Sequence, residues 1–300
     1  DSVPPTSRYA HRPGRWVAEP SWPSANVTPR RQPLAPGRIL AQGAAAPQAA
    51  LPIQSPLTVG LFAGKWCSYA AGPDLAHDQR QEDGGALVFD TDPLSETVDI
   101  LGAPEVELEL ASDKPLAMVA VRLSDVGPDD KATRVTYGML NLTHRKSRTH
   151  PEPLTQGKRV TVRVKMNDVA QSFPAGHRIR LSVSTSYWPL AWPSPEPARL
   201  TVHTGNSALE LPVRAARDAD AALPAFAPPE GAPPAPRHLV AEGHHNWLVH
   251  RDLAADLSTL EVINDNGIVH LEDIDLEVEN RAFEWYSSRG DDFLSVAGET

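Results

Sequence analysis

The sequence predicts an all-β protein whose main part is a sandwich of two antiparallel sheets. Thirty prolines and nineteen glycines in 300 residues, with only 6% aromatic residues, are typical of many short strands joined by turns. From about residue 86 onward apolar residues recur at every second position, and no stretch there keeps the spacing of a long helix. Alternate side chains of two such sheets meet in a common core, which favours the sandwich.

The first 55 residues are predicted to form an extended arm. They are rich in proline, arginine and alanine, and the segment "RWVAEPSWPS" places Trp16 and Trp22 in a non-periodic sequence. If these two aromatic side chains are buried, they pin the arm to another surface. Residues 41–52 are low in complexity and indicate a surface loop.

Four runs of apolar residues mark strands of the sandwich. They are "EVELEL" (105–110), "AMVAVRL" (117–123), "VTVRVKM" (160–166) and "RIRLSVST" (178–185). The first, third and fourth runs alternate, whereas the second is almost continuously apolar, as in a strand that is buried on both faces. Clusters of glycine, proline and aspartate, such as "SDVGPDD", separate the runs.

Residues 215–237 are predicted to be a semi-rigid linker, because six prolines fall within thirteen residues. This linker separates the sandwich, residues 1–214, from an acidic β segment, residues 238–300, which we expect to be truncated. In that segment Asn266-Gly267 offers the positive φ angles of a tight hairpin turn. The last strand leaves an edge that we expect something outside this chain to cover.

The charge distribution argues against nucleic-acid and membrane partners. The net charge is −10, and residues 238–300 hold fourteen acidic residues against three arginines, which leaves residues 1–237 close to neutral. Neither part has the basic face that nucleic-acid binding needs. No apolar run approaches the roughly 20 residues of a membrane helix, so we expect a soluble protein. The single cysteine excludes an internal disulfide and is compatible with the bacterial cytoplasm, where we expect the protein.

Sequence motifs for catalysis and metal binding are absent. The chain contains no Gly-x-Ser-x-Gly, no His-Glu-x-x-His, no phosphate-binding glycine loop and no Cys-x-x-Cys. Three weaker candidates have plainer explanations. Cys67 is explained as a small buried hydrophobe, the histidines from His238 to His250 as a polar surface turn, and Asp90 with Asp92 as a routine turn rather than calcium ligands. We therefore predict no catalytic residue, no metal site and no cofactor.

Three segments together resemble a known family. They are "DQRQEDGGALVFDTDPLSETVDILGAPEVELELASDKP", "RVTYGMLNLTHR" and "FPAGHRIRLSVSTSYWPLAWPSPEPARLTV". In this order they are similar to the C-terminal domain of the X-prolyl dipeptidyl-peptidase and cocaine-esterase (CocE/NonD) family of serine hydrolases, over roughly residues 8–212. The resemblance implies a jelly-roll β-sandwich of galactose-binding-domain-like fold, with additional β-strands at the C-terminus.

The resemblance also implies a partner. In this family an α/β-hydrolase domain supplies the catalytic serine, aspartate and histidine and precedes the jelly roll in the same parent chain. None of those residues has a position here, which agrees with the missing motifs. Because the sequence lacks an initiator methionine, we expect it to begin where the hydrolase domain would end.

Two aromatic loops are the candidate sites. The resemblance implies that residues 60–80 approach the hydrolase active site, so Leu61, Phe62, Trp66 and Tyr69 are candidates for walls of the substrate pocket; the alternative is that they pack inside the jelly roll. In "STSYWPLAWPSPEPA", proline fixes the loop while Tyr187, Trp188 and Trp192 offer large apolar area. They indicate an interface with the hydrolase domain or with another subunit, and internal core packing is the alternative.

The sequence therefore predicts a non-catalytic module that covers and shapes the active site of a serine hydrolase and supports its fold or a homo-oligomer. One alternative is a carbohydrate-binding jelly-roll module, which requires Trp188 or Trp192 exposed on a concave face. Another is an independent enzyme that uses the histidines between His238 and His250. Whether the parent cleaves Xaa-Pro peptides, esters or acylated amino acids stays open.

Overall fold

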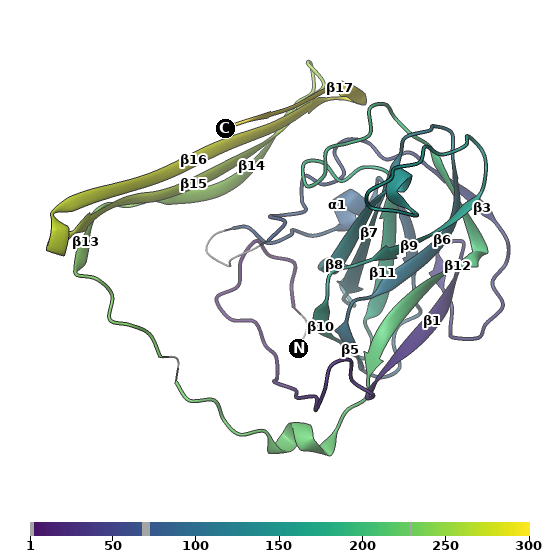
Figure 1. The fold of residues 1–300 in the computed structure, drawn as a ribbon, viewed down its shortest axis with the longest axis horizontal. Helices are drawn as coiled ribbons and strands as arrows, with labels where there is room; N and C mark the ends of the chain where they lie inside the picture. Colours follow the sequence, from purple (N-terminus) through teal and green to yellow (C-terminus); the bar gives the residue numbers. More distant parts are fainter. Residues whose placement is uncertain (1–2, 68–72, 229) are drawn as a thin grey trace.

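The chain folds as a β-sandwich followed by a second, separate sheet (Figure 1). The computed structural model describes residues 3–67, 73–228 and 230–300. Within them, twelve strands form one connected sheet system and the last five form the other. The all-β prediction, with additional strands at the C-terminus, is confirmed. Within the described residues, no helix is long and apolar enough to cross a membrane.

The sandwich contains the first twelve strands and two short helical turns. The strands are β1 Val27–Ala35, β2 Arg38–Ile39, β3 Ala50–Ile53, β4 Leu87–Asp90, β5 Val98–Gly102, β6 Glu105–Ser112, β7 Met118–Val126, β8 Ala132–Asn141, β9 Val160–Lys165, β10 Val169–Phe173, β11 Arg178–Ser184 and β12 Leu200–Arg214. The turns are α1 Arg80–Asp83 and the 3₁₀ turn η1 Leu142–His144. The strand β3 begins inside the segment that the sequence indicates as a surface loop.

Strand β1 joins the two layers of the sandwich. Residues 27–33 pair with β12, which also pairs with β3, β5 and β6, and β9 and β10 extend this first layer. Leu34 and Ala35 pair instead with β2, which leads through β4, β11 and β7 to β8 in the second layer. A strand that changes layers closes one corner of the sandwich.

The core lies between the two layers and consists of the alternate apolar residues that the sequence marked. Val106, Leu108 and Leu110 of β6 are fully buried in it. Strand β7 is buried along its whole length, as its almost continuous apolar sequence predicted. Its odd-numbered residues from 119 to 123 enter the core, whereas Met118 and Ala120 point outward and pack under the loops described below.

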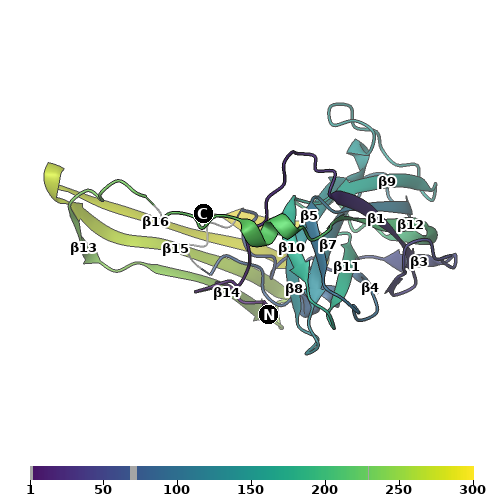
Figure 2. The ribbon, with the colours of Figure 1, turned by 90° about the horizontal axis from the view of Figure 1, so that it is seen from below.

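The C-terminal sheet is long and extends away from the sandwich (Figure 2). Its strands are β13 Arg237–Ala241, β14 His244–Asp252, β15 Leu257–Leu271, β16 Leu276–Arg289 and β17 Asp292–Glu299, with the 3₁₀ turn η3 Glu272–Ile274. Strands β13 and β14 pair with successive parts of β15, which pairs on its other side with β16, and β17 follows β16.

The predicted hairpin turn at Asn266-Gly267 is wrong. These residues lie inside β15, where the pairing with β16 shifts between Asp265 and Ile268. Gly267 has a φ of +74°, and a Cβ at this position would overlap the carbonyl oxygen of Ala241 in β13. The positive φ therefore serves a bulge that bends a long strand, rather than a turn that ends one.

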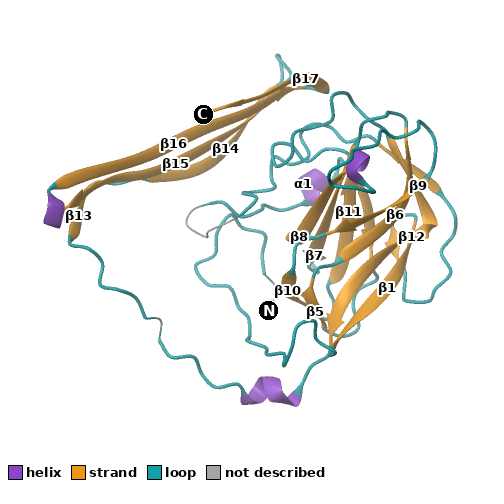
Figure 3. Cartoon of the chain, viewed as in Figure 1, coloured by secondary structure: helices purple, strands orange, loops and turns teal. Residues whose placement is uncertain are grey.

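The described residues 215–228 and 230–236 lie between the sandwich and the C-terminal sheet and have no regular structure apart from η2 Asp218–Ala222 (Figure 3). The crossing begins at a group of charges that we call the arm clasp: Glu19, Arg214, Arg217 and Asp220. The Arg214 Nε lies 2.7 Å from Glu19 Oε1, and its Nη2 lies 2.7 Å from Asp220 Oδ1. Arg217 reaches the other oxygen of Glu19 at 3.3 Å. The clasp ties together the N-terminal arm, the end of β12 and the linker.

The two tryptophans of the arm are exposed rather than buried. Trp16 is 71% exposed and Trp22 is 63% exposed. Trp16 packs edge-on against Phe226 of the linker, with ring centroids 4.8 Å apart. Arg15 pairs with Asp99 of β5 and Arg12 donates to Gln171 of β10, so contacts with the sandwich, the clasp and the linker together hold the arm.

Candidate functional site

Both aromatic loops of the sequence analysis lie on the outer face of the second layer of the sandwich. Val59 and Ala63, in the 57–67 loop, pack with Tyr187 against the outward side chains of Met118 and Ala120. The backbone of Gly60 lies so close to Trp188 that a Cβ on Gly60 would overlap the Trp188 carbonyl oxygen. Gly60 has a φ of +124°, a region that other residues rarely adopt. The fold thus brings the two loops together as one surface.

Buried polar groups hold the backbone of the 57–67 loop from below. Glu82, in α1, accepts hydrogen bonds through Oε1 from the backbone N–H of Gly60 at 3.1 Å and of Phe62 at 2.8 Å. At the other polar group of the same residue, the carbonyl oxygen of Phe62 accepts from the backbone N–H of His77 at 3.0 Å and from Gln79 Nε2 at 3.4 Å. Phe62 is therefore fixed at both its N–H and its carbonyl group.

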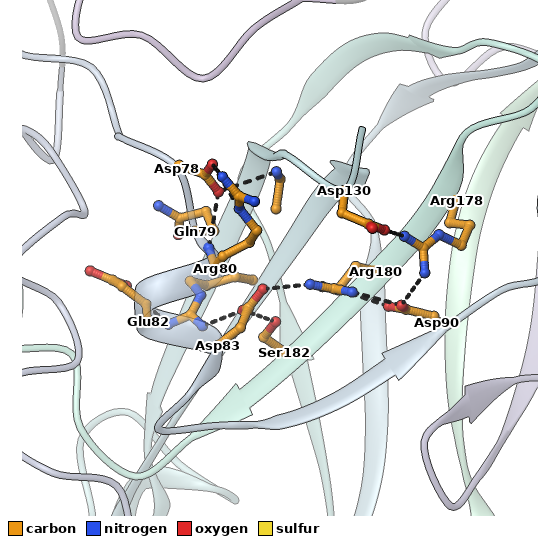
Figure 4. Close-up of polar contacts among 12 residues, drawn as sticks. Asp78, Gln79, Arg80, Glu82, Asp83, Asp90, Asp130, Arg178, Arg180 and Ser182 are labelled. Atoms are coloured by element: carbon orange, nitrogen blue, oxygen red, sulfur yellow. Dashed lines mark hydrogen bonds and ion pairs between the residues drawn. The ribbon is translucent and has the colours of Figure 1, made fainter. Parts of the chain in front are cut away.

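Glu82 belongs to a chain of alternating charges that runs across the outer face of the strands (Figure 4). Arg122 of β7 donates to Glu82 at 3.1 Å and to Asp83 at 2.9 Å. Asp83 also accepts from Arg180 of β11 at 3.0 Å. Arg180 continues to Asp90 at 2.7 Å. Because each carboxylate meets at least one guanidinium and the innermost groups are fully buried, these charges form a rigid base under the loop.

Burial shifts the pKa values of several groups at this base. Burial raises the pKa of Glu82, and the positive charge of Arg122 and the two backbone donors oppose the rise. Burial raises the pKa of Tyr187 to about 12, although Arg134 donates to its hydroxyl at 2.7 Å. Burial lowers the pKa of His77, whose ring lies edge-on to Phe62. Tyr187 and His77 are thus held neutral at pH 7, as packing groups.

The structure separates the predicted site residues into buried and exposed ones. Leu61, Tyr187 and Trp188 are buried, with 5%, 0% and 1% of their surface exposed. Phe62 is partly exposed, whereas Trp66 is 72% and Trp192 is 64% exposed. Tyr69 lies outside the described residues. The exposed members, rather than the buried ones, are available to a partner.

The C-terminal sheet packs against two of the buried members, Leu61 and Trp188. Leu61 packs with Leu260 and Val262 of β15, and Phe62, Trp247 and Tyr286 lie against the same cluster. Trp188 meets Tyr286 edge-on at 6.0 Å between ring centroids. Sequence reasoning missed Trp247 and Tyr286. The alternation of Leu260 and Val262 in "LEVIND" was the available signal, because it marks a face of β15 that must be covered.

The remaining chemical candidates are dispersed or already paired. His238 and His250 stand on β13 and β14, where each meets a glutamate, Glu272 and Glu261 respectively. No group of three or more metal-ligating side chains occurs within the described residues. The oxygens of Asp90 accept from Arg178 and Arg180, and those of the exposed Asp92 face Arg38. Their charge is therefore compensated by guanidinium groups. Cys67, also in the 57–67 loop, is half-buried.

The model of one protein family, the X-Pro dipeptidyl-peptidase C-terminal non-catalytic domain, matches residues 2–250. The chain belongs to this family. As a member of the X-Pro dipeptidyl-peptidase C-terminal family it is a non-catalytic domain, in agreement with the resemblance found in the sequence. Residues 251–300, with most of the C-terminal sheet, lie beyond the match.

Several proteins that the chain resembles in sequence or fold are named as hydrolases. The chain is 27% identical over 103 residues to the cocaine esterase of Rhodococcus sp. (strain MB1 Bresler), a match that spans 34% of the chain and 18% of the esterase. An aminopeptidase from the marine sediment archaeon Thaumarchaeota archaeon superimposes with a TM-score of 0.59 at 21% identity, over 67% of the chain and 39% of the aminopeptidase. An α-amino acid ester hydrolase superimposes with a TM-score of 0.53 at 23% identity, over 62% of the chain and 36% of the hydrolase.

A CocE/NonD family hydrolase from Staphylococcus aureus gives a TM-score of 0.53 at 10% identity, over 70% of the chain and 40% of the hydrolase. The solved structures therefore show that the chain shares the fold of one part of such proteins. In each comparison the matched region spans less than half of the relative's own length.

Proposed function

We propose that this domain covers and shapes the active site of an α/β-hydrolase domain that precedes it in the same parent chain. The observation that carries the proposal is the fixed backbone of Phe62, held at both polar groups above a buried base of charges. A residue held in this way, with its side chain still partly exposed, suits a pocket wall that must keep its position. Trp66 and Trp192, on the same two loops, are exposed aromatic side chains that can add to the contact area.

The parent enzyme, in this proposal, transfers an acyl group to water through a serine ester intermediate. The serine, its base and the donors that stabilise the oxyanion belong to the catalytic domain. This domain contributes apolar contact area and excludes water from one side of the pocket. The names of the relatives, an esterase, an aminopeptidase and an amino acid ester hydrolase, support acyl compounds as the substrate class.

The test compares this chain with the full-length parent on p-nitrophenyl acetate and Ala-Pro-p-nitroanilide, with fluorophosphonate labelling of any activated serine. We expect no turnover and no label from the chain alone, and both from the parent. In the parent, Phe62→Ala lowers kcat/KM, because it removes part of the wall, whereas Leu116→Ala in the turn between β6 and β7 leaves it unchanged. A labelled serine in the chain alone, or equal kinetics for both variants, would refute the proposal.

Carbohydrate binding is the second candidate, favoured by the exposed Trp192. Trp188, the other residue that this function would use, is buried and offers no ring face to a sugar. A change in tryptophan fluorescence on addition of oligosaccharides, lost in Trp192→Ala, would support it.

The predicted homo-oligomer also stays a prediction, which sedimentation velocity of the purified chain tests directly.

A further inference from the structure

Three partly exposed aromatic side chains from distant parts of the chain gather at the 57–67 loop. Phe62 belongs to the loop, whereas Trp247 and Tyr286 belong to β14 and β16 of the C-terminal sheet. The buried base beneath them consists of Leu61, Leu260 and Val262. Figure 1 shows the end of the sheet nearest β17 lying beside the sandwich loops while its other end extends away from them.

The pairing of the strands determines which side chains face the loop. Trp247 lies directly opposite Val262, and Tyr286 lies directly opposite Leu260. Directly opposed residues of an antiparallel pair point to the same face of a sheet. Phe283 and Trp285 of β16, whose rings stack at 6.3 Å, therefore point to the opposite face.

Contacts on both aromatic loops position this face of the sheet. Leu61 packs against it from the 57–67 loop, and Trp188 meets Tyr286 from the other loop. Glu82 holds the backbone on both sides of Leu61, the residue on which this face of the sheet packs. Phe62, Trp247 and Tyr286 thus pack, each partly exposed, around one buried cluster.

We infer that Trp247 and Tyr286 are specificity-determining residues that, together with Phe62, form one aromatic wall against which the acyl group of the substrate packs. The inference rests on the function proposed above, which places Phe62 at the pocket. Aromatic rings over a buried apolar base offer a rigid, flat surface suited to an apolar chain or ring. The family match, residues 2–250, includes Trp247 and ends before Tyr286.

The experiment measures kcat/KM of the full-length parent for p-nitrophenyl acetate, butyrate and hexanoate. Trp247→Ala and Tyr286→Ala each remove a ring and enlarge the pocket. We expect the ratio of kcat/KM for hexanoate to that for acetate to change by about tenfold, because one or a few methylene groups in an apolar pocket change discrimination by this order. Phe283→Ala and Trp285→Ala are the matched controls from the opposite face, and we expect less than about a twofold change in the same ratio.

The outcomes separate this inference from the proposed function. If Phe62→Ala alters the ratio and neither sheet variant does, the wall belongs to the sandwich alone and the inference is overturned. If Phe62→Ala has no effect either, the proposed function fails with it. Equal effects of the variants and their controls would also overturn the inference. Tyr286→Phe keeps the ring and its packing, so it should retain the hexanoate-to-acetate ratio of the unmutated enzyme. Thermal unfolding of each variant shows whether a changed ratio reflects loss of folding.

Discussion

At the scale of single residues, Glu82 is the group on which the candidate site depends most. It is fully buried, and it joins the backbone of the 57–67 loop to Arg122 in the middle of β7. A buried charge pair is stable only while each partner neutralises the other. The short segment "RQED" of α1 therefore links loop position to strand packing through one carboxylate.

Glu82→Leu should lower the free energy of unfolding by about 3–5 kcal/mol, because it leaves Arg122 with only part of its compensating charge and leaves two backbone donors without their acceptor. Glu82→Gln should cost less, since its amide oxygen still accepts from the loop. Urea unfolding of the purified chain measures these differences. Asp92→Asn, which removes an exposed partner of Arg38, should change the free energy by less than about 1 kcal/mol.

A double variant tests whether charge compensation is the reason. Glu82→Leu combined with Arg122→Met removes both charges. The double variant should therefore lose less unfolding free energy than the two single variants lose in sum. Additive losses would show that the two residues act independently, contrary to the contact described above.

At the scale of elements, the close approach of the two loops depends on Gly60. Gly60→Ala introduces a Cβ into the carbonyl group of Trp188 and a side chain at a φ of +124°. We expect a lower melting temperature and a changed near-ultraviolet circular dichroism spectrum, because the loop must move away from Trp188. Gly176→Ala is the matched control, since Gly176 also has a positive φ, +82°, but has open space around it. Equal destabilisation by both variants would show that backbone strain, rather than the contact between loops, decides the result.

The strands of the sandwich were predictable because their pattern is local. Alternation in β6, β9 and β11 reflects one buried face, and this periodicity is visible in a single sequence. Asn266-Gly267 was not predictable in the same way. The dipeptide permits positive φ both in a turn and in a bulge, and only the pairing of β13 and β16 with β15 decides between them.

The candidate site was predicted in part. Its two aromatic loops follow from composition and from the family resemblance, but the base beneath them does not. Arg122 stands within the apolar run of β7, and nothing local in the sequence shows that Glu82, forty residues earlier, reaches it. The contribution of Trp247 and Tyr286 likewise depends on how the C-terminal sheet packs on the sandwich, which is a long-range contact that no local pattern encodes.

At the scale of the whole molecule, the arm clasp joins three parts of the chain at one point. Hydrogen bonds from Ser24 and Asn26, together with Arg214, lower the pKa of Glu19. Hydrogen bonding to Arg214 lowers the pKa of Asp220. A carboxylate whose pKa is lowered by folding stabilises the fold above its ordinary pKa, and this contribution is lost as the pH falls through the lowered value.

The clasp should therefore weaken in acid. The ordinary values of these carboxyl groups are 4.5 for Glu19 and 3.8 for Asp220, so the stabilisation is complete near neutral pH and declines below about pH 4. Arg214→Met removes the guanidinium that Glu19 and Asp220 share. The melting temperature of this variant should decline less steeply in acid than that of the unmutated chain. Melting curves between pH 7 and pH 2.5 measure the difference. Arg38→Met removes one partner of an exposed ion pair, so its melting temperature should decline in acid as steeply as that of the unmutated chain. If the melting temperatures of the unmutated chain and both variants declined in parallel, this role of the clasp would be contradicted.

The pairing of β1 with β12 has a consequence for biosynthesis. Val27 lies opposite Arg214, so the strand that connects the two layers receives its partner only after most of the sandwich has been translated. At a translation rate of roughly 5–20 residues per second, β1 stays without its partner β12 for about ten seconds or more after its own synthesis. During that interval the exposed edge of β1 is a target for chaperones and for pairing with other nascent chains, and slower translation lengthens the exposure.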